Sequence, residues 1–145
     1  MTALNKARLI QAASKARQRA VAPYSRFQVG AALLTDRVVT VTGANVESAS
    51  FGLTCCAERV ALFKALTGGH KNFLAMAVVA RADGGVMPCG ACRQLLAEYA
   101  PKAVVLTADS DGLGRIREFT VKELLPGAFL SFTSEQIRSG RIRSM

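Results

Sequence analysis

Two short cysteine patterns constrain this chain more strongly than any other feature of its sequence. The first is Cys56-Ala57-Glu58, and the second is Pro88-Cys89-Gly90-Ala91-Cys92. Each stands where a helix is predicted to begin: residues 56–66 end at a pair of glycines, and residues 89–99 follow one proline and stop at another. The partial positive charge at a helix N-terminus favours thiolate over thiol, and thiolate is the form that binds metal.

Three of these cysteines match the ligand set of a catalytic zinc ion. Cys89 and Cys92 share one helix face, so a single ion can contact both, and Cys56 would supply the third thiolate from the neighbouring helix. Three protein ligands leave the fourth tetrahedral position open to water, whose pKa zinc can lower to about 7. Glu58 is placed to accept the water proton and to deliver it to a ring nitrogen and a leaving amine. A glutamate that is not a ligand, beside a P-C-x-x-C segment, is typical of zinc nucleobase deaminases.

Three thiolates make such a site net negative, which weakens the pull of the metal on its water. A nearby cation would offset this charge, and Arg59, directly after Glu58, is the expected donor to the cysteine sulfurs. Arg93 is a second candidate for the same role.

Plainer interpretations of the same residues stay open at this point. A lone C-x-x-C pair is often half of a structural zinc site or a redox pair, although neither would give Glu58 a role. Cys55 is expected to be a small buried hydrophobic residue, with a ligand role as its alternative. His70 is expected to be a surface residue of a loop.

Length and composition indicate one globular domain, residues 1–145. Half of the 145 residues are apolar and only 20% are charged, which is enough apolar material for a buried core. No run of 18 apolar residues could span a membrane, and the first twenty residues lack the apolar core of a signal peptide. We therefore expect a cytoplasmic protein, in which the four cysteines stay reduced.

The net charge of +9 raises the question of a nucleic-acid partner. The excess lies at the two ends of the chain: no acid precedes Asp36, and the segment after Glu135 holds three arginines and no acid. Solvated terminal faces account for this distribution better than a polyanion-binding surface around the cysteines does. A nucleic-acid partner is therefore not expected.

The order of predicted elements favours an α/β fold. Continuous apolar runs at 73–80 and 103–107 are typical of strands that are covered on both faces. The two strands that follow the first helix are expected to form a hairpin. The whole order gives a mixed five-stranded sheet with helices on both faces, a three-layer domain. Helices are predicted over 4–20, 56–66, 89–99 and 121–125, and strands over 27–35, 37–42, 73–80, 103–107 and 115–120.

Over nearly its whole length the chain resembles the short, homotetrameric, zinc-dependent cytidine deaminases. Five motifs occur in the order of that family: Pro23-Tyr24-Ser25-Arg26-Phe27 with Val29-Gly30-Ala31-Ala32, Gly43-Ala44-Asn45-Val46-Glu47, Cys56-Ala57-Glu58-Arg59, the segment 88–94, and Leu124-Leu125-Pro126-Gly127-Ala128-Phe129. The resemblance implies a cytidine-deaminase-like three-layer fold with one Zn²⁺ per subunit. It also implies a homotetramer with sites at subunit interfaces, and a C-terminal tail from about residue 130 that lies at an interface or is flexible.

The resemblance further implies the residues that bind the substrate. Asn45 and Glu47 would hydrogen-bond the ribose, with Glu47 accepting from the 3′-hydroxyl, because an amide and a carboxylate are what a buried sugar hydroxyl needs. Phe27 would pack on the pyrimidine ring, and Ala57 would contact the base through its backbone. Phe129 would close the site of a neighbouring subunit. A turn cap for Asn45, and ordinary core packing for Phe27 and Phe129, stay open as alternatives.

The implied reaction is hydrolytic deamination of cytidine and 2′-deoxycytidine to uridine and 2′-deoxyuridine, with release of ammonia, in pyrimidine salvage. A zinc-activated water would attack C4, and Glu58 would carry the proton. The alternative is another cytosine-containing substrate, either a nucleoside antibiotic or a base within nucleic acid. Deaminases of nucleic acids commonly have histidine in the first ligand motif, where this chain has Cys56.

Two positions depart from the pattern of the family. Ser48 stands where the family usually has asparagine, and a shorter side chain there could loosen the loop that carries Glu47. The turn around residues 36–39 lacks the usual glycine, which bears on the strand connection rather than on the site.

Overall fold

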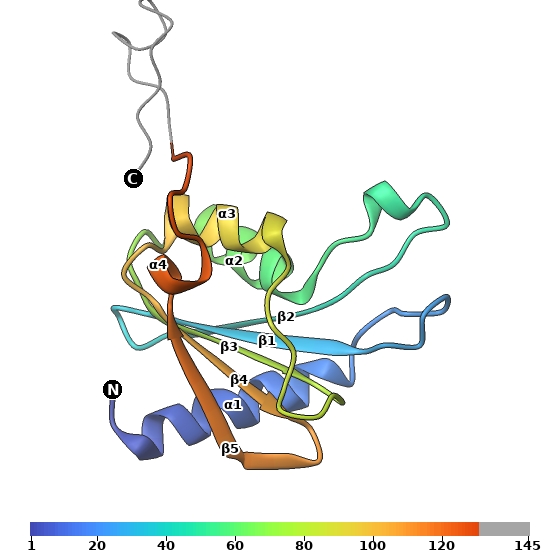
Figure 1. The fold of residues 1–145 in the computed structure, drawn as a ribbon, viewed down its shortest axis with the longest axis horizontal. Coiled ribbons are helices and arrows are strands. Elements are labelled where there is room, and N and C mark those ends of the chain that lie inside the picture. The colour runs from blue at the N-terminus through green and yellow to red at the C-terminus, as the bar shows by residue number, and fades with distance from the viewer. Residues whose placement is uncertain (131–145) are drawn as a thin grey trace, which may run out of the picture.

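Four α-helices and five strands lie within residues 1–130, the part of the chain that the computed structural model describes (Figure 1). The predicted tail from about residue 130, with its three arginines, lies almost entirely outside this range. In order, the elements are α1 (Ala3–Arg17), β1 (Val29–Thr35), β2 (Thr40–Ala44), the 3₁₀ turn η1 (Phe51–Leu53), α2 (Ala57–Thr67), β3 (Phe73–Ala80), α3 (Gly90–Tyr99), β4 (Val104–Asp109), β5 (Gly112–Thr120) and α4 (Val121–Leu124).

The strands form one mixed five-stranded sheet, as predicted, and their order in it is β2-β1-β3-β4-β5. The pairs β2–β1, β1–β3 and β4–β5 are antiparallel, and β3–β4 is parallel. A parallel neighbour needs a crossover connection, and α3 is the helix in the connection from β3 to β4. Residues 81–89 lead from the end of β3 to the first residues of α3, which lie close to the start of α2.

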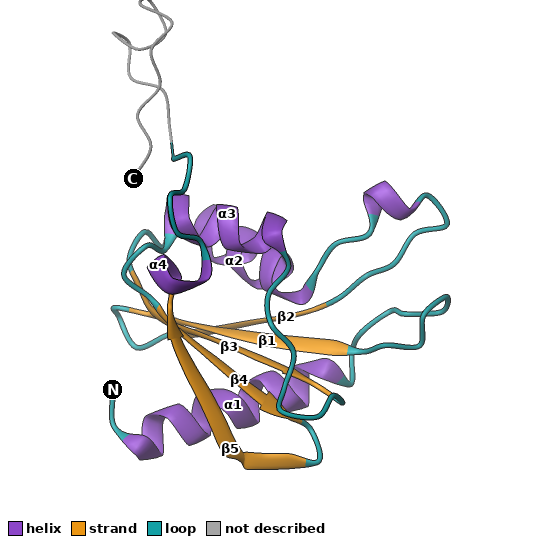
Figure 2. Cartoon of the chain, viewed as in Figure 1, coloured by secondary structure: helices purple, strands orange, loops and turns teal. Residues whose placement is uncertain are grey.

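Helices cover both faces of this sheet, which confirms the three-layer prediction (Figure 2). On β3, Ala75, Ala77 and Val79 pack with α1, whereas Met76 and Val78 pack with α2 and α3. Because both sets are buried, the strand needs apolar residues at every position rather than at alternate ones. This requirement explains the unbroken apolar run that predicted it.

Close contact between α2 and β2 depends on Gly43. A Cβ atom at this position would lie 2.5 Å from Ala61 N and 2.6 Å from Ala57 O, so any side chain would push the helix away from the strand. Gly43 thus lets the first turns of α2 lie directly on the sheet. The residues at the N-terminus of α2 are positioned by this contact.

Strand and helix ends differ from the prediction by a few residues. β2 begins at Thr40 rather than at residue 37, because residues 36–38 form the hairpin turn. In that turn Val38 adopts a left-handed φ of 61°, the conformation for which the missing glycine is suited. β1 begins at Val29 rather than at residue 27, and β5 begins three residues earlier than predicted.

Within residues 1–130, no helix has the length and apolar content that a membrane crossing requires.

Candidate active site

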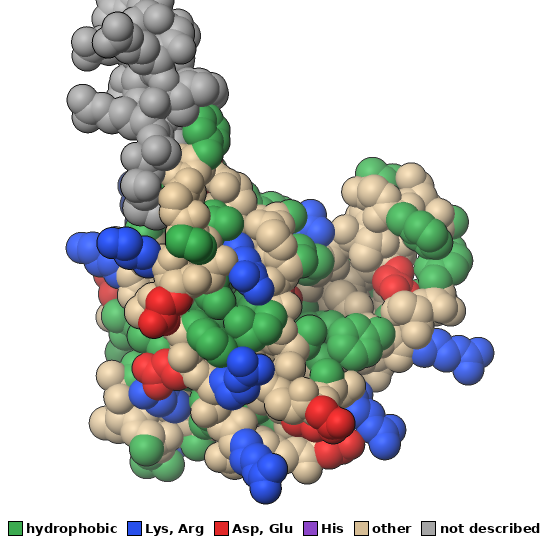
Figure 3. Space-filling view, in the orientation of Figure 1, with side chains coloured by type: hydrophobic (Ala, Val, Ile, Leu, Met, Phe, Trp, Pro, Cys, Tyr) green, Lys and Arg blue, Asp and Glu red, His purple; other side chains and the backbone are tan. Residues whose placement is uncertain are grey.

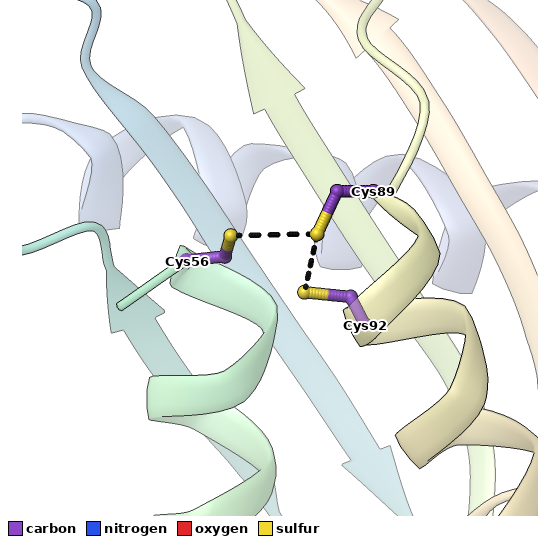
Figure 4. A group of neighbouring side chains, drawn as sticks. All are labelled: Cys56, Cys89 and Cys92. Atoms are coloured by element: carbon purple, nitrogen blue, oxygen red, sulfur yellow. Dashed lines mark hydrogen bonds between the residues drawn. The ribbon is translucent and has the colours of Figure 1, made fainter. Parts of the chain in front are cut away.

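Cys56, Cys89 and Cys92 come together at the N-termini of α2 and α3 (Figure 4). Cys56 is the N-cap of α2 and Cys89 is the N-cap of α3, while Cys92 lies in the first turn of α3. The sulfur of Cys89 lies 3.7 Å from that of Cys56 and 3.5 Å from that of Cys92. All three sulfurs lie within 4.8 Å of one another, so the structure places the three predicted ligands in one cluster.

The geometry of this cluster fits zinc. A tetrahedral ion with zinc–sulfur bonds of about 2.3 Å requires sulfurs about 3.8 Å apart, close to the separations of the three cysteines. Cys92 is buried and Cys89 is exposed, so the cluster opens on one side only. Three thiolate donors with an open side are the ligand arrangement of a catalytic zinc ion rather than of a closed structural one.

The surroundings of the cluster favour thiolate at Cys56. Hydrogen bonding from Cys92, with further donors from Arg59 and Cys89, lowers the pKa of the Cys56 thiol to about 5 against the opposing effect of burial. The pKa of Cys92 is raised, because its proton serves the Cys56 sulfur and because it is buried.

Arg59 supplies the positive charge at the cluster. Its Nη2 donates to the Cys56 sulfur at 3.4 Å and to the Thr54 carbonyl at 3.2 Å, and its buried Nε has no partner within the described residues. Arg93 contacts other groups: its Nε donates to the Pro88 carbonyl at 2.7 Å, and its Nη1 to the Leu124 carbonyl at 3.0 Å. Arg93 thus holds the start of the second cysteine motif against the end of α4.

Glu58 lies beside the cluster in the first turn of α2, with only 5% of its surface exposed. Burial raises the pKa of its carboxyl group to about 6, because the charged form loses its hydration. A carboxyl group with a pKa near neutrality can both accept and release a proton.

A cavity of about 270 Å³ opens in front of Glu58. Figure 3 shows the molecule hollowed between its main body and the loops that project on the right. The predicted site residues that line the cavity are Phe27, Asn45, Glu47, Cys56, Ala57, Glu58 and Cys89. The cavity is also lined by five residues that were not predicted as site residues: Ser25, Val29, Thr54, Val86 and Met87. Their positions within or next to the cysteine and Pro-Tyr-Ser-Arg-Phe motifs are the only sequence signal that could have indicated them.

Two predicted sugar-binding residues are held by the loops around the cavity. Glu47 Oε1 accepts hydrogen bonds from the backbone N–H groups of Tyr24 and Ser25, each at 3.1 Å. Hydrogen bonding by the Ser25 side chain, with these N–H groups, lowers the pKa of Glu47. Asn45 is buried and braces the start of β1: its Oδ1 accepts from Val29 N, and its Nδ2 donates to the Phe27 carbonyl, both at 2.8 Å. One amide hydrogen of Asn45 remains after these bonds.

The other residues singled out in the sequence lie outside the cavity. Phe129 does not line it; its carbonyl oxygen accepts a hydrogen bond from Gln94 of α3. Cys55 is half-buried and is not part of the sulfur cluster, and His70 is half-buried behind the C-terminus of α2. Ser48 caps a local turn, with its Oγ accepting from Ser50 N and its own N–H donating to Thr54 Oγ1, both at 3.1 Å.

Comparison with known proteins agrees with this site. Residues 4–108 match the model of the cytidine and deoxycytidylate deaminase zinc-binding region. The chain is 54% identical to a cytidine deaminase of Halalkalibacterium halodurans over 83% of its length and 91% of the relative's. It is 46% identical to one of Sporosarcina psychrophila over 89% of its length and 97% of the relative's. A crystal structure of the Burkholderia pseudomallei cytidine deaminase superposes with a TM-score of 0.81 at 46% identity, covering 89% of this chain and all of that one. The chain therefore belongs to the zinc-dependent cytidine and deoxycytidylate deaminase family.

Proposed function

We propose that this protein hydrolytically deaminates cytidine and 2′-deoxycytidine to uridine and 2′-deoxyuridine, releasing ammonia. The observation that carries the proposal is the buried Glu58 beside three convergent cysteine sulfurs, at the wall of a cavity. Deamination at C4 needs an activated water and a group that moves protons to the ring and to the leaving amine. This wall of the cavity provides ligands for the first requirement and a suitable carboxyl group for the second.

The residues around the cluster take separate roles in this proposal. Cys56, Cys89 and Cys92 hold one zinc ion, which when bound supplies Lewis-acid activation of water. Glu58 accepts a proton from the attacking water and donates it to N3 of the ring. It then accepts the proton of the C4 hydroxyl of the tetrahedral intermediate and passes it to the departing amine, which leaves as ammonia while the C4 carbonyl forms. Its pKa of about 6 suits both directions of transfer near neutral pH. Arg59 reduces the negative charge that three thiolates place on the site.

Substrate binding is assigned to the cavity wall away from the sulfurs. Phe27 packs against the pyrimidine, and the backbone of Ala57 contacts the base. Glu47 accepts a hydrogen bond from the 3′-hydroxyl, and Asn45 donates its remaining amide hydrogen to the sugar while it braces β1. Ala57 is fully buried in the core cluster beneath the cavity wall, so a larger side chain there would have to displace its neighbours.

The charges that line the cavity favour a nucleoside over a nucleotide. Glu47 and Glu58 are acidic, and neither lysine nor arginine lines the cavity within the described residues. A 5′-phosphate would find no cation there and would meet two carboxyl groups instead. The same argument disfavours a base within a nucleic acid, despite the net charge of +9.

We further propose a homotetramer in which Phe129 of one subunit closes the site of another. Support comes from exposed apolar side chains on the projecting loops, Tyr24 at 56%, Phe51 at 79% and Leu53 at 74%, which are an unusual concentration for a monomer surface. We also propose that residues 1–145 form a single domain that works in the cytoplasm in pyrimidine salvage. The four unpaired cysteines support a reducing compartment.

A direct assay tests the proposed function. The protein, loaded with one equivalent of zinc, is given cytidine, 2′-deoxycytidine, deoxycytidylate or a cytosine-containing oligonucleotide at physiological salt, and ammonia release is measured. We expect turnover of the two nucleosides and kcat/KM at least about tenfold lower for the phosphorylated substrates, which corresponds to one unfavourable charge contact. Preference for the nucleotide or the oligonucleotide would overturn the assignment.

A further inference from the structure

Glu47 forms no ion pair with any residue in the part of the chain that the structure describes. Within residues 1–130, the ion pairs are Lys6–Glu118 and Arg81–Asp111, and neither involves Glu47. Its carboxylate is held instead by the N–H groups of Tyr24 and Ser25, which both donate to Oε1. Both bonds use the same oxygen, so Oε2 is the atom that a substrate hydroxyl would meet.

These two N–H groups belong to a tight turn next to the segment that carries Glu47. The segments are joined by a bridge between Val21 and Val46, with Glu47 N donating to Val21 O at 2.8 Å, and they project together on the right of Figure 1. Tyr24, Ser25 and Phe27 are all exposed, so apart from an edge-to-face contact between the Tyr24 and Phe51 rings the turn is held by hydrogen bonds. The direction of the two N–H groups therefore depends on the internal bonds of the turn.

Ser25 closes that turn across a strained residue. Arg26 has a left-handed φ of 57°, a conformation that is strained for a non-glycine residue. The Ser25 Oγ accepts from Phe27 N at 3.0 Å, so its hydrogen bond spans Arg26 and holds the chain in the strained conformation. The pKa of Glu47 also responds to the Ser25 side chain more than to any other group.

We propose that Ser25 is a positioning residue for sugar recognition, acting through the carboxylate of Glu47. Its hydroxyl closes the turn over Arg26, its N–H and that of Tyr24 fix Oε1, and Oε2 is thereby directed at the 3′-hydroxyl of the nucleoside. The inference rests on the proposed function, because it assigns to Glu47 the sugar contact of a nucleoside substrate.

The test compares Ser25→Ala, Ser25→Thr and wild type with two substrates, cytidine and 3′-deoxycytidine. Loss of one neutral hydrogen bond predicts that Ser25→Ala raises KM for cytidine by about three- to tenfold, with kcat within about twofold of wild type. Ser25→Thr keeps an Oγ and should restore the KM for cytidine. For 3′-deoxycytidine, which lacks the hydroxyl that Glu47 accepts, Ser25→Ala should change KM by less than about twofold.

A double-mutant cycle with Glu47→Gln separates this role from a direct contact of Ser25 with the substrate. The effect of Ser25→Ala should largely disappear in the Glu47→Gln background, and a full effect there, or an equal effect on 3′-deoxycytidine, would overturn the proposal. Asp109→Ala is the matched control, because its Oδ1 makes the same kind of bond to Asp111 N in a turn outside the cavity. Zinc content and thermal stability show whether each variant is folded. If wild type released no ammonia from either nucleoside, the proposed function would be at fault rather than the role of Ser25.

Discussion

The two halves of the cavity are built in opposite ways. The metal half consists of Cys56, Glu58, Cys89 and Cys92 at the starts of two helices that pack on a buried sheet. The sugar half consists of loop residues, with Glu47 held by backbone N–H groups of an exposed turn.

The two halves differ in what holds their side chains in place: the packed core fixes the metal half, and individual hydrogen bonds fix the sugar half. The N-termini of helices that pack on a sheet are held rigid by the close-packed core, so the sulfurs and Glu58 keep their positions without further local contacts. The sugar half has few buried apolar contacts. Its geometry depends on individual hydrogen bonds and on the contacts that the exposed loops make with a neighbouring subunit in the proposed tetramer. Substitutions in the metal half should therefore affect chemistry or metal content, and those in the sugar half should affect KM.

Loss of a sulfur ligand gives the largest expected effect. Cys92→Ala leaves two thiolates, and zinc content should fall from about one ion per chain to near zero, with turnover below detection. Cys55→Ala is the matched control, since Cys55 lies outside the cluster, and it should keep both zinc and activity. Metal analysis after gel filtration, together with an ammonia assay, checks both variants. Full zinc content in Cys92→Ala would exclude the three-cysteine site.

Glu58→Ala is next in size and separates metal binding from proton transfer. We expect kcat to fall by about 10²–10⁴-fold, the usual contribution of a general acid–base group, while zinc stays at one ion per chain. Steady-state kinetics with metal analysis on the same preparation makes the measurement. Retained turnover would remove Glu58 from the mechanism and leave the cavity without a proton carrier.

Glu47→Gln should weaken substrate binding by the sugar half of the cavity. A lost hydrogen bond to a charged acceptor predicts an increase in KM for cytidine of about 10–100-fold, with kcat much less affected. With 3′-deoxycytidine as substrate the same variant should resemble wild type. A large fall in kcat at unchanged KM would mean that the two halves are not separate in function.

Glu58 should also make the metal-free protein less stable at neutral pH. Its folded pKa of about 6 lies above the ordinary 4.5, so the folded state binds the proton more tightly than the unfolded state does. The stabilisation is complete below pH 4.5 and is lost as the pH rises through 6. Metal-free Glu58→Gln avoids this loss and should exceed wild type at pH 7 by about 1–2 kcal/mol, a difference that vanishes near pH 4.5. Urea unfolding with a reductant at both pH values measures it; equal stabilities at pH 7 would contradict the burial cost.

Val38→Gly gives the smallest effect and tests strain outside the cavity. Relief of the left-handed valine, less the extra entropy of glycine in the unfolded chain, predicts a gain of about 0.5–1 kcal/mol. Thermal unfolding should shift upward by a few degrees while KM and kcat stay unchanged. A change in KM would show that this hairpin communicates with the sugar half.

The sequence predicted most of the sheet because the elements signal themselves locally. β3 was placed at its observed bounds, since a strand buried on both faces must be apolar throughout. The ends of β1 and β2 were misplaced by two or three residues, because Asn45 and the turn at Val38 set those ends through contacts that periodicity does not encode. Ser25 was missed as a cavity residue for the same reason: its role depends on a carboxylate 22 residues away in the chain.

The sequence predicted the metal ligands and the proton carrier, because such groups are defined by residue type and by spacing within single helical turns. Tertiary structure alone decided how these groups meet. The crossover through α3 brings Cys89 and Cys92 to Cys56, and Gly43 lets α2 lie against β2 so that Glu58 is buried with a raised pKa. The fold also determines that Arg59, and not Arg93, contacts a sulfur, since Arg93 donates to two carbonyl groups instead. Burial and hydrogen-bond direction depend on residues distant in the chain, and only the folded molecule brings those together.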